Sequence, residues 1–214
     1  MRHINLETWP RREHFTGFRD WDYPHFSMCA NVDLTAFRPV LKKRAVSFNV
    51  AIVYVLARAA NAIPEFRRRI RGGEAVEHEI VHPSSTIMGD DDLFTFCTFD
   101  YTEDFSLFAP RATEQIACAQ EDPTISNEPD RDDLLYMTAI PWVSFTSFMH
   151  PLLLFPADSV PRFAWGKFFE EGKSLKMPLS VQGHHALMDG LHVGRFYAEV
   201  QAYFDDPDSV LGGA

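Results

Sequence analysis

Gly183-His184-His185-Ala186-Leu187-Met188-Asp189-Gly190 is the most informative segment of the sequence. It follows a strand-like segment, 177–182, and precedes a segment, 191–204, whose apolar residues recur at helical spacing. The stretch is therefore expected on a turn between a strand and a helix, where loops commonly display catalytic groups. An imidazole on such a turn can accept a proton from a hydroxyl near neutral pH, which makes the histidine pair a candidate general base.

The composition describes an acidic chain with a large apolar fraction. The 214 residues are 46% apolar and carry a formal net charge of −10. This size suits a single domain over residues 1–214 with a sizeable core. Nucleic-acid grooves and polybasic membrane surfaces need clustered cations, so neither partner is expected. Three scattered cysteines, no signal-peptide pattern and no bilayer-length apolar run predict a cytoplasmic protein with free thiols and no metal.

Helical and strand-like patterns alternate along the rest of the chain. Residues 47–63 and 105–120 carry apolar residues at helical spacing, which predicts a helix in each segment. Pro110 disfavours the second helix because it lacks a backbone N–H. Further strands are expected at 26–32, 75–81, 93–99 and 142–148. Residues 120–133 are acidic and contain proline, and strand-like sequence resumes directly after them, which predicts a surface loop rather than a domain boundary. This interspersion predicts an α/β (α+β) fold with a mixed β-sheet and packed helices.

His78-Glu79-Ile80-Val81-His82 matches the His-Glu-x-x-His signature of zinc proteases. That signature needs a helix, which places both imidazoles on one face. Pro83 follows directly and disfavours helical backbone angles at His82. On a strand the two histidines would stand about 13 Å apart, too far to share one metal ion. A zinc hydrolase is therefore the least favoured of the functions considered.

The His-His-x-x-x-Asp-Gly pattern of residues 184–190 is shared by chloramphenicol acetyltransferases, plant-type acyl-CoA-dependent acyltransferases and peptide-synthetase condensation domains. The other segments that resemble chloramphenicol acetyltransferases occur in that family's order over nearly the whole chain: Arg11-Arg12-Glu13-His14-Phe15, Pro64-Glu65-Phe66-Arg67, Pro141-Trp142-Val143-Ser144-Phe145-Thr146-Ser147-Phe148, Met177-Pro178-Leu179-Ser180-Val181-Gln182 and Asp189-Gly190-Leu191-His192-Val193-Gly194-Arg195. The length also fits one subunit of that family. The chain thus resembles the chloramphenicol acetyltransferases, which implies their single-domain CoA-dependent acyltransferase fold.

The resemblance implies catalytic roles for four residues. His185 is the implied general base, and Ser147 is the implied donor to the developing oxyanion. Asp189 is implied to pair with Arg11 and so to hold the His185 turn in place. The implied reaction is direct transfer of an acetyl group from acetyl-CoA to a hydroxyl, without an acyl-enzyme. The implied assembly is a homotrimer whose active sites lie at subunit interfaces.

The resemblance also implies which side chains contact the two substrates. The implied contacts of the hydroxyl acceptor are Phe18, Phe26, Phe94, Phe96 and Leu134. The implied contacts of acetyl-CoA are Lys167, Phe168 and Trp142.

Several positions depart from the family pattern. Gly17, Asp22 and Pro24 stand where drug-binding members tend to carry aromatic or other apolar side chains, and Ala164 stands in place of a threonine. We therefore expect acyl transfer to be retained and chloramphenicol itself to be a poor acceptor. The alternative function is a catalytically weak trimer of the same fold that binds CoA or another small molecule. The intact catalytic set argues against that alternative.

Overall fold

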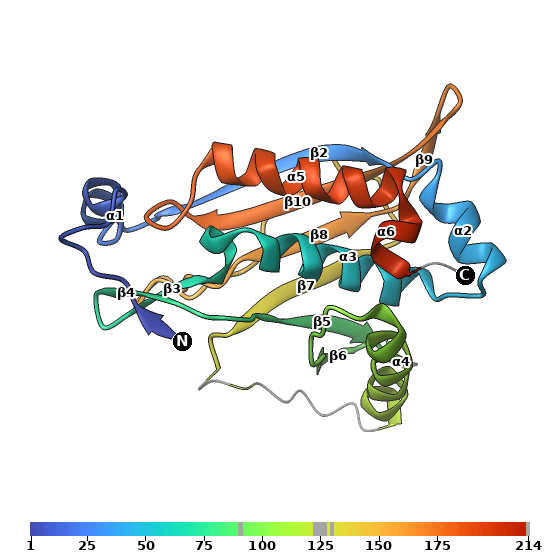
Figure 1. The fold of residues 1–214 in the computed structure, drawn as a ribbon, viewed down its shortest axis with the longest axis horizontal. Helices are drawn as coiled ribbons and strands as arrows, with labels where there is room; N and C mark the ends of the chain where they lie inside the picture. Colours follow the sequence, from blue (N-terminus) through green and yellow to red (C-terminus); the bar gives the residue numbers. More distant parts are fainter. Residues whose placement is uncertain (90–91, 122–127, 129–130, 213–214) are drawn as a thin grey trace.

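The computed structural model describes residues 1–89, 92–121, 128 and 131–212 and is built around a seven-stranded mixed sheet (Figure 1). Its strands are β2 (His25–Asp33), β5 (His82–Met88), β6 (Phe94–Thr98), β7 (Leu134–Ile140), β8 (Arg162–Gly166), β9 (Phe169–Glu171) and β10 (Ser174–His184). They pair in the order β2-β10-β8-β7-β5-β6, and β9 adds to one end of β10. The β5–β7 and β7–β8 pairs are parallel and the other pairs antiparallel. The expected mixed sheet is confirmed.

The helices gather on one face of this sheet and at its ends (Figure 1). They are α1 (Arg12–Phe18), α2 (Phe37–Lys43), α3 (Phe48–Ala62), α4 (Phe105–Glu121), α5 (Gly190–Asp205) and α6 (Pro207–Leu211), with a 3-10 turn, η1, at Pro64–Arg67. Helix α3 is apolar nearly all round and buried along most of its length, as expected of a helix in the middle of a core. None of the described helices is both long and apolar enough to cross a membrane.

Aromatic rings in the core pack the helical layer against the sheet. The ring of Phe163 on β8 lies 5.0 Å from that of Phe196 on α5. Phe66 of η1 contacts both rings, at centroid distances of 5.8 Å and 5.0 Å. Because β8 is hydrogen-bonded to β10, this packing also fixes the strand that leads into the histidine pair.

A second, three-stranded sheet lies beside α1 and η1. It consists of β1 (Arg2–His3), β3 (Arg68–Arg71) and β4 (Glu74–Glu77), in the order β1-β4-β3. The strand expected over 75–81 is therefore shorter than predicted, because the chain leaves the β3–β4 hairpin after Glu77.

The prediction of a strand over residues 142–148 was wrong. The segment is irregular, and its aromatic side chains pack on each other: the rings of Phe145 and Phe148 lie 5.4 Å apart. Its backbone is held to β8 and the following turn at one point, where the amide of Lys167 donates to the carbonyl of Val143. Gly166 permits this approach, since a Cβ there would lie 2.7 Å from that carbonyl oxygen.

The three expected helices are confirmed as α3, α4 and α5, and Pro110 is accommodated inside α4. Strand β7 begins directly after residue 133, where strand-like sequence was expected to resume, whereas β5 and β8 were not predicted from the sequence. The surface loop predicted for residues 120–133 lies for the most part outside the described residues.

Candidate active site

The candidate site is the turn between β10 and α5. At its start, the carbonyl of His184 accepts hydrogen bonds from the amides of Leu187 and Met188, which folds the chain back on itself. Gly183 makes room for this turn, because a Cβ there would lie only 2.4 Å from the sulfur of Met188. The amide of His185 donates to the carbonyl of Pro24 at 2.8 Å, which ties the turn to the segment before β2.

Arg11, just before α1, binds this turn with three nitrogens. Its Nε donates to the carbonyl of Ala186 at 3.0 Å, and Nη2 donates to the carbonyl of His185 at 2.8 Å. Its Nη1 donates to Oδ2 of Asp189 at 2.7 Å. A planar guanidinium can serve three acceptors in fixed directions, so one side chain holds both the backbone and the carboxylate of the turn.

Asp189 also begins helix α5. Its side chain accepts a hydrogen bond from the amide of Leu191, and its own amide donates to Nδ1 of His192, completing a capping box. Partial burial acts to raise the pKa of Asp189, but the hydrogen bond from Arg11 and the nearby His192 outweigh it and lower that pKa. The carboxylate is therefore charged at neutral pH and serves as a structural anchor of the turn.

The ring of His185 is oriented by one hydrogen bond and two aromatic contacts. Nδ1 lies 3.1 Å from the carbonyl oxygen of Met188. Because a carbonyl only accepts, Nδ1 carries a proton, and in the neutral ring Nε2 keeps its lone pair. The ring stacks on Phe18 at a centroid distance of 4.3 Å and contacts Phe26 at 5.2 Å. The arrangement leaves Nε2 chemically able to accept a proton.

A large cavity of ≈ 1130 Å³ lies along a different part of the sheet. The sequence-predicted substrate contacts that line it are Phe94, Phe96, Trp142, Lys167 and Phe168. Its lining is mainly apolar, drawn from β5, β6, β7 and β8 and from the segment after β7. A cavity of this kind, with a few polar groups in its lining, suits a small-molecule ligand.

The structure does not bring all the predicted residues together in one chain. His185, Phe18, Phe26, Arg11 and Asp189 form one group around the turn, and none of these five residues lines the cavity. Among the described residues, no hydrogen bond links the exposed Ser147 to His185.

Leu134 belongs to neither group. It is 2% exposed at the start of β7, its carbonyl accepts from Arg69, and it does not line the cavity.

A buried polar cluster beside the site was not predicted from the sequence. His150 and His184 belong to it, together with His25 and Gln182, and each carries at least one buried nitrogen without a hydrogen-bond partner in the described part of the chain. The rings of His25 and His184 lie 5.1 Å apart. Burial lowers the pKa of both His150 and His184 from 6.5 to about 4. No sequence pattern signals the cluster, because residues far apart in the chain form it.

Acidification is expected to destabilise the protein through these two histidines. Both are neutral when folded, so between pH 6.5 and pH 4 the unfolded chain binds more protons. Lowering the pH from 7.5 to 5.0 should therefore cost about 2 kcal/mol for each ring. The free energy of unfolding is measured in urea at fixed protein concentration. In His150→Leu, the decrease in this free energy on acidification should be roughly half of that caused by the two histidines together. His14→Gln, an exposed histidine, is the control, and an unchanged pH dependence in His150→Leu would refute the assignment.

The zinc-protease signature does not form the helix that its chemistry requires. His78 follows β4 and lies 2.9 Å from a carboxylate oxygen of Asp132, whereas His82 begins β5 and accepts from the amide of Tyr101. The two imidazoles therefore have separate partners and do not share a helical face.

The mixed sheet carries the His-His-x-x-x-Asp-Gly turn between β10 and α5. Residues 1–201 match the family model of chloramphenicol acetyltransferase. A chloramphenicol acetyltransferase from Klebsiella sp is 34% identical over 204 residues, which cover 95% of this chain and 93% of that protein. The chain belongs to the chloramphenicol acetyltransferase family, and the resemblance noted in the sequence is confirmed.

Solved structures agree with this membership. A chloramphenicol acetyltransferase structure superposes with a TM-score of 0.83 at 27% identity, covering 95% of this chain and 99% of the solved one. A dihydrolipoamide acetyltransferase from Azotobacter vinelandii shares the fold, with a TM-score of 0.66 at 16% identity over 88% of this chain and 84% of its own.

Proposed function

We propose that this enzyme transfers an acetyl group from acetyl-CoA to a hydroxyl of a small molecule, chloramphenicol or a related acceptor. The observation that carries the proposal is the His185 ring, whose Nδ1 is tied to Met188 and whose Nε2 is left with its lone pair. The names of the 34% identical relatives support chloramphenicol as the acceptor to test first. We further propose that the enzyme is cytoplasmic.

In the proposed reaction, Nε2 of His185 takes the proton of the acceptor hydroxyl as its oxygen attacks the thioester carbonyl carbon. The hydroxyl of Ser147 donates to the oxyanion of the tetrahedral intermediate. Collapse of the intermediate breaks the carbon–sulfur bond, and the CoA thiolate recovers the proton from the imidazolium. The products are an ester and free CoA, with every proton returned, so neither a metal nor a cysteine is needed.

We propose that the working site is shared between subunits of a homotrimer. Within one chain, His185 belongs to the turn beside α1, whereas the apolar cavity and Trp142 lie along β5 to β8. The separation of the two groups supports a site that one subunit completes for the next, as closed rings of identical interfaces allow. Ser147 would then face the histidine of the neighbouring subunit.

Subunit mixing tests this shared site. We expect Ser147→Ala to lower kcat by about 10²–10³-fold, since it removes one donor to the oxyanion. Homotrimers of Ser147→Ala or of His185→Ala should both be nearly inactive. Co-refolding them in equal amounts should restore roughly one quarter of the wild-type sites, because some interfaces pair an intact histidine with an intact serine. Thr146→Ala is the matched neighbour control, and no recovery on mixing would place each site within one chain.

The direct test of the proposed function is release of free thiol from acetyl-CoA by the purified enzyme, with and without chloramphenicol. Release that requires an added hydroxyl compound supports acetyl transfer. Fast, saturable release with micromolar chloramphenicol would overturn our expectation that the altered pocket makes it a poor acceptor. Binding of CoA without turnover on any hydroxyl acceptor would favour the alternative, a binding trimer.

A further inference from the structure

A row of hydrogen-bonding side chains crosses the seven-stranded sheet. Side chains at paired positions of neighbouring strands lie on the same face of a sheet, and here six such positions in succession are polar. This polar row takes one residue from each of β2, β10, β8, β7, β5 and β6, in that order: Ser27, Gln182, Arg162, Tyr136, Ser84 and Thr98. Phe163, the neighbour of Arg162 in the chain, packs against α5. Because side chains alternate along a strand, the polar row lies on the face opposite to α5.

The middle of the polar row lines the large cavity. Ser84, Tyr136 and Arg162 all contribute to the cavity lining. They come from three adjacent strands, and strands lie about 4.8 Å apart, so the row spans roughly 10 Å of the lining. Thr138, two positions after Tyr136 on β7, lies on the same face and also lines the cavity. One small molecule can therefore contact several of these side chains at once.

Several polar groups of the cavity lining have no hydrogen-bond partner in the described part of the chain. They include the hydroxyls of Tyr136 and Thr138. Both ring nitrogens of His150, which lines the cavity as well, are buried and lack a partner among the described residues. Polar groups shielded from water normally find hydrogen-bond partners, so these groups are suited to bind the polar groups of a ligand.

The charge of the polar row is compensated within the protein. Nη2 of Arg162 donates to Oδ2 of Asp158, and Nη1 donates to the carbonyl of Val160 at 2.9 Å. The guanidinium carbon also lies 5.0 Å from the centroid of the Tyr136 ring. An ionised ligand group beside Tyr136 would therefore meet an ion pair whose charges already offset each other, and it would lose its own hydration. Uncharged hydroxyl groups are favoured at this position.

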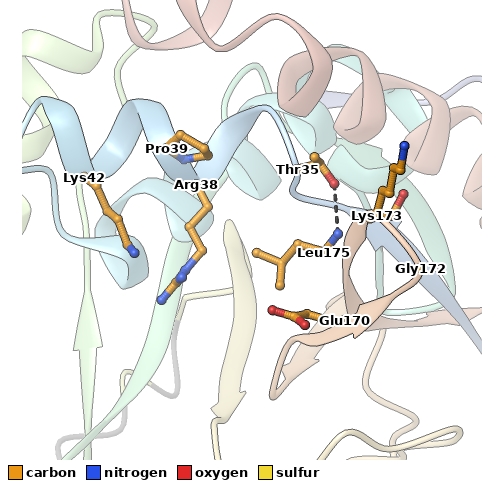
Figure 2. Close-up of a pocket in the computed structure, with 9 residues that line it drawn as sticks. Thr35, Arg38, Pro39, Lys42, Glu170, Gly172, Lys173 and Leu175 are labelled. Atoms are coloured by element: carbon orange, nitrogen blue, oxygen red, sulfur yellow. Dashed lines mark hydrogen bonds between the residues drawn. The ribbon is translucent and has the colours of Figure 1, made fainter.

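Beside the polar row the cavity is aromatic. Phe94 and Phe96 line it from β6, with ring centroids 5.6 Å apart. The groove of ≈ 510 Å³ between α2 and the β9–β10 hairpin is of a different kind, because charged side chains of both signs line it, namely Arg38, Lys42 and Glu170 (Figure 2). Of these two sites, the cavity is the one that combines aromatic rings with uncharged hydroxyl groups.

We propose that the acceptor of this enzyme is an uncharged molecule with an aromatic end and several hydroxyl groups along one edge, as in an aryl glycoside. The hydroxyl groups of the acceptor bind Tyr136, Thr138 and the ring of His150, and its aromatic end packs on Phe94 and Phe96. A hydroxyl both donates and accepts, and so do the tyrosine, the threonine and a neutral imidazole. This inference rests on the proposed function, which makes a small hydroxyl compound the acceptor, and it names the chemical class of that compound.

The test compares two acceptors, phenyl β-glucoside and phenoxyethanol. Both contain a phenyl ether and a primary hydroxyl, but only the glucoside carries further hydroxyl groups. The wild type should show a kcat/KM for acceptor-dependent thiol release at least tenfold higher for the glucoside, in line with one or two added hydrogen bonds. In the double variant Tyr136→Phe/Thr138→Val this ratio should fall about tenfold through a higher KM for the glucoside, and Tyr136→Phe alone should give part of the fall. Tyr203→Phe is the matched control, because Tyr203 lies on α5 and does not line the cavity.

Two outcomes would overturn the inference: equal kcat/KM for the two acceptors in the wild type, or an unchanged ratio in the double variant. Acetylation of phenoxyethanol or chloramphenicol without acetylation of the glucoside would uphold the proposed function and reject the inference. Calorimetry with phenyl β-glucoside covers the remaining case. Binding that the double variant weakens about tenfold, without acetyl transfer to any hydroxyl, would uphold the polar row as a ligand site and reject the proposed function.

Discussion

Replacing His185 by glutamine is expected to lower kcat by about 10²–10⁴-fold, the usual contribution of a positioned general base. Glutamine keeps a polar group near the ring position, but it has no basic nitrogen to take the hydroxyl proton. The contact of Nδ1 with Met188 and the stacking on Phe18 orient the His185 ring. Losing these two contacts should therefore not weaken the binding of acetyl-CoA. The rate of thiol release should therefore collapse while KM for acetyl-CoA stays within a few-fold of the wild type.

His14→Gln is the matched control, because His14 is an exposed histidine on the neighbouring helix α1. Its kcat should equal that of the wild type. Circular dichroism and thermal unfolding of His185→Gln should show an intact fold. A His185→Gln enzyme that keeps more than about a tenth of wild-type kcat would rule out the general-base assignment.

Replacing Arg11 by methionine is expected to destabilise the protein by about 3 kcal/mol. The change removes three hydrogen bonds and leaves the Asp189 carboxylate without its cation. This loss of unfolding free energy is small for a buried ion pair because the side chain of Asp189 is 32% exposed. Water can therefore solvate the carboxylate in part once Arg11 is removed. The midpoint of urea unfolding measures this effect, and thiol release should fall with it as the His185 turn loosens.

A double-mutant cycle separates the ion pair from the backbone contacts. Asp189→Asn should cost less than Arg11→Met, since Arg11 keeps its bonds to the carbonyls of His185 and Ala186. Arg11→Lys should recover little stability, because a single ammonium cannot reach three acceptors arranged for a planar fork. Arg12→Met, at the next position and exposed, is the control. Equal stabilities of Arg11→Met and Arg12→Met would mean that Arg11 does not hold the turn.

The pattern of neighbouring residues was enough to predict the β10–α5 turn. The other contacts of the candidate site join residues far apart in the chain. Strand β10, the turn and α5 are consecutive, and their hydrogen bonds join neighbours such as His184 and Leu187. The pattern alone was therefore sufficient to predict them. Arg11 contacts the turn across 178 positions, and only the family resemblance indicated that pair.

The cavity could not be predicted in the same way. It depends on the parallel pairs β5–β7 and β7–β8, and neither β5 nor β8 was expected. Strand β8 carries Arg162 and ends at Gly166, which weakens its strand pattern. Residues 142–148 alternate between apolar and polar side chains as a strand does, but Phe145 and Phe148 bury part of their apolar surface by packing on each other. Side-chain packing decided the local structure against the alternation.

The contact between Arg11 and Asp189 also sets when the His185 turn can form during synthesis of the chain. A ribosome releases the chain from the N-terminus, so helix α1 emerges long before the residues of the β10–α5 turn. Until those 178 later positions are made, Arg11 has no turn to bind, and the closing of so long a loop comes late in folding. Incomplete chains would therefore lack the ion pair that holds the His185 turn, and this part of the site would form only late in folding.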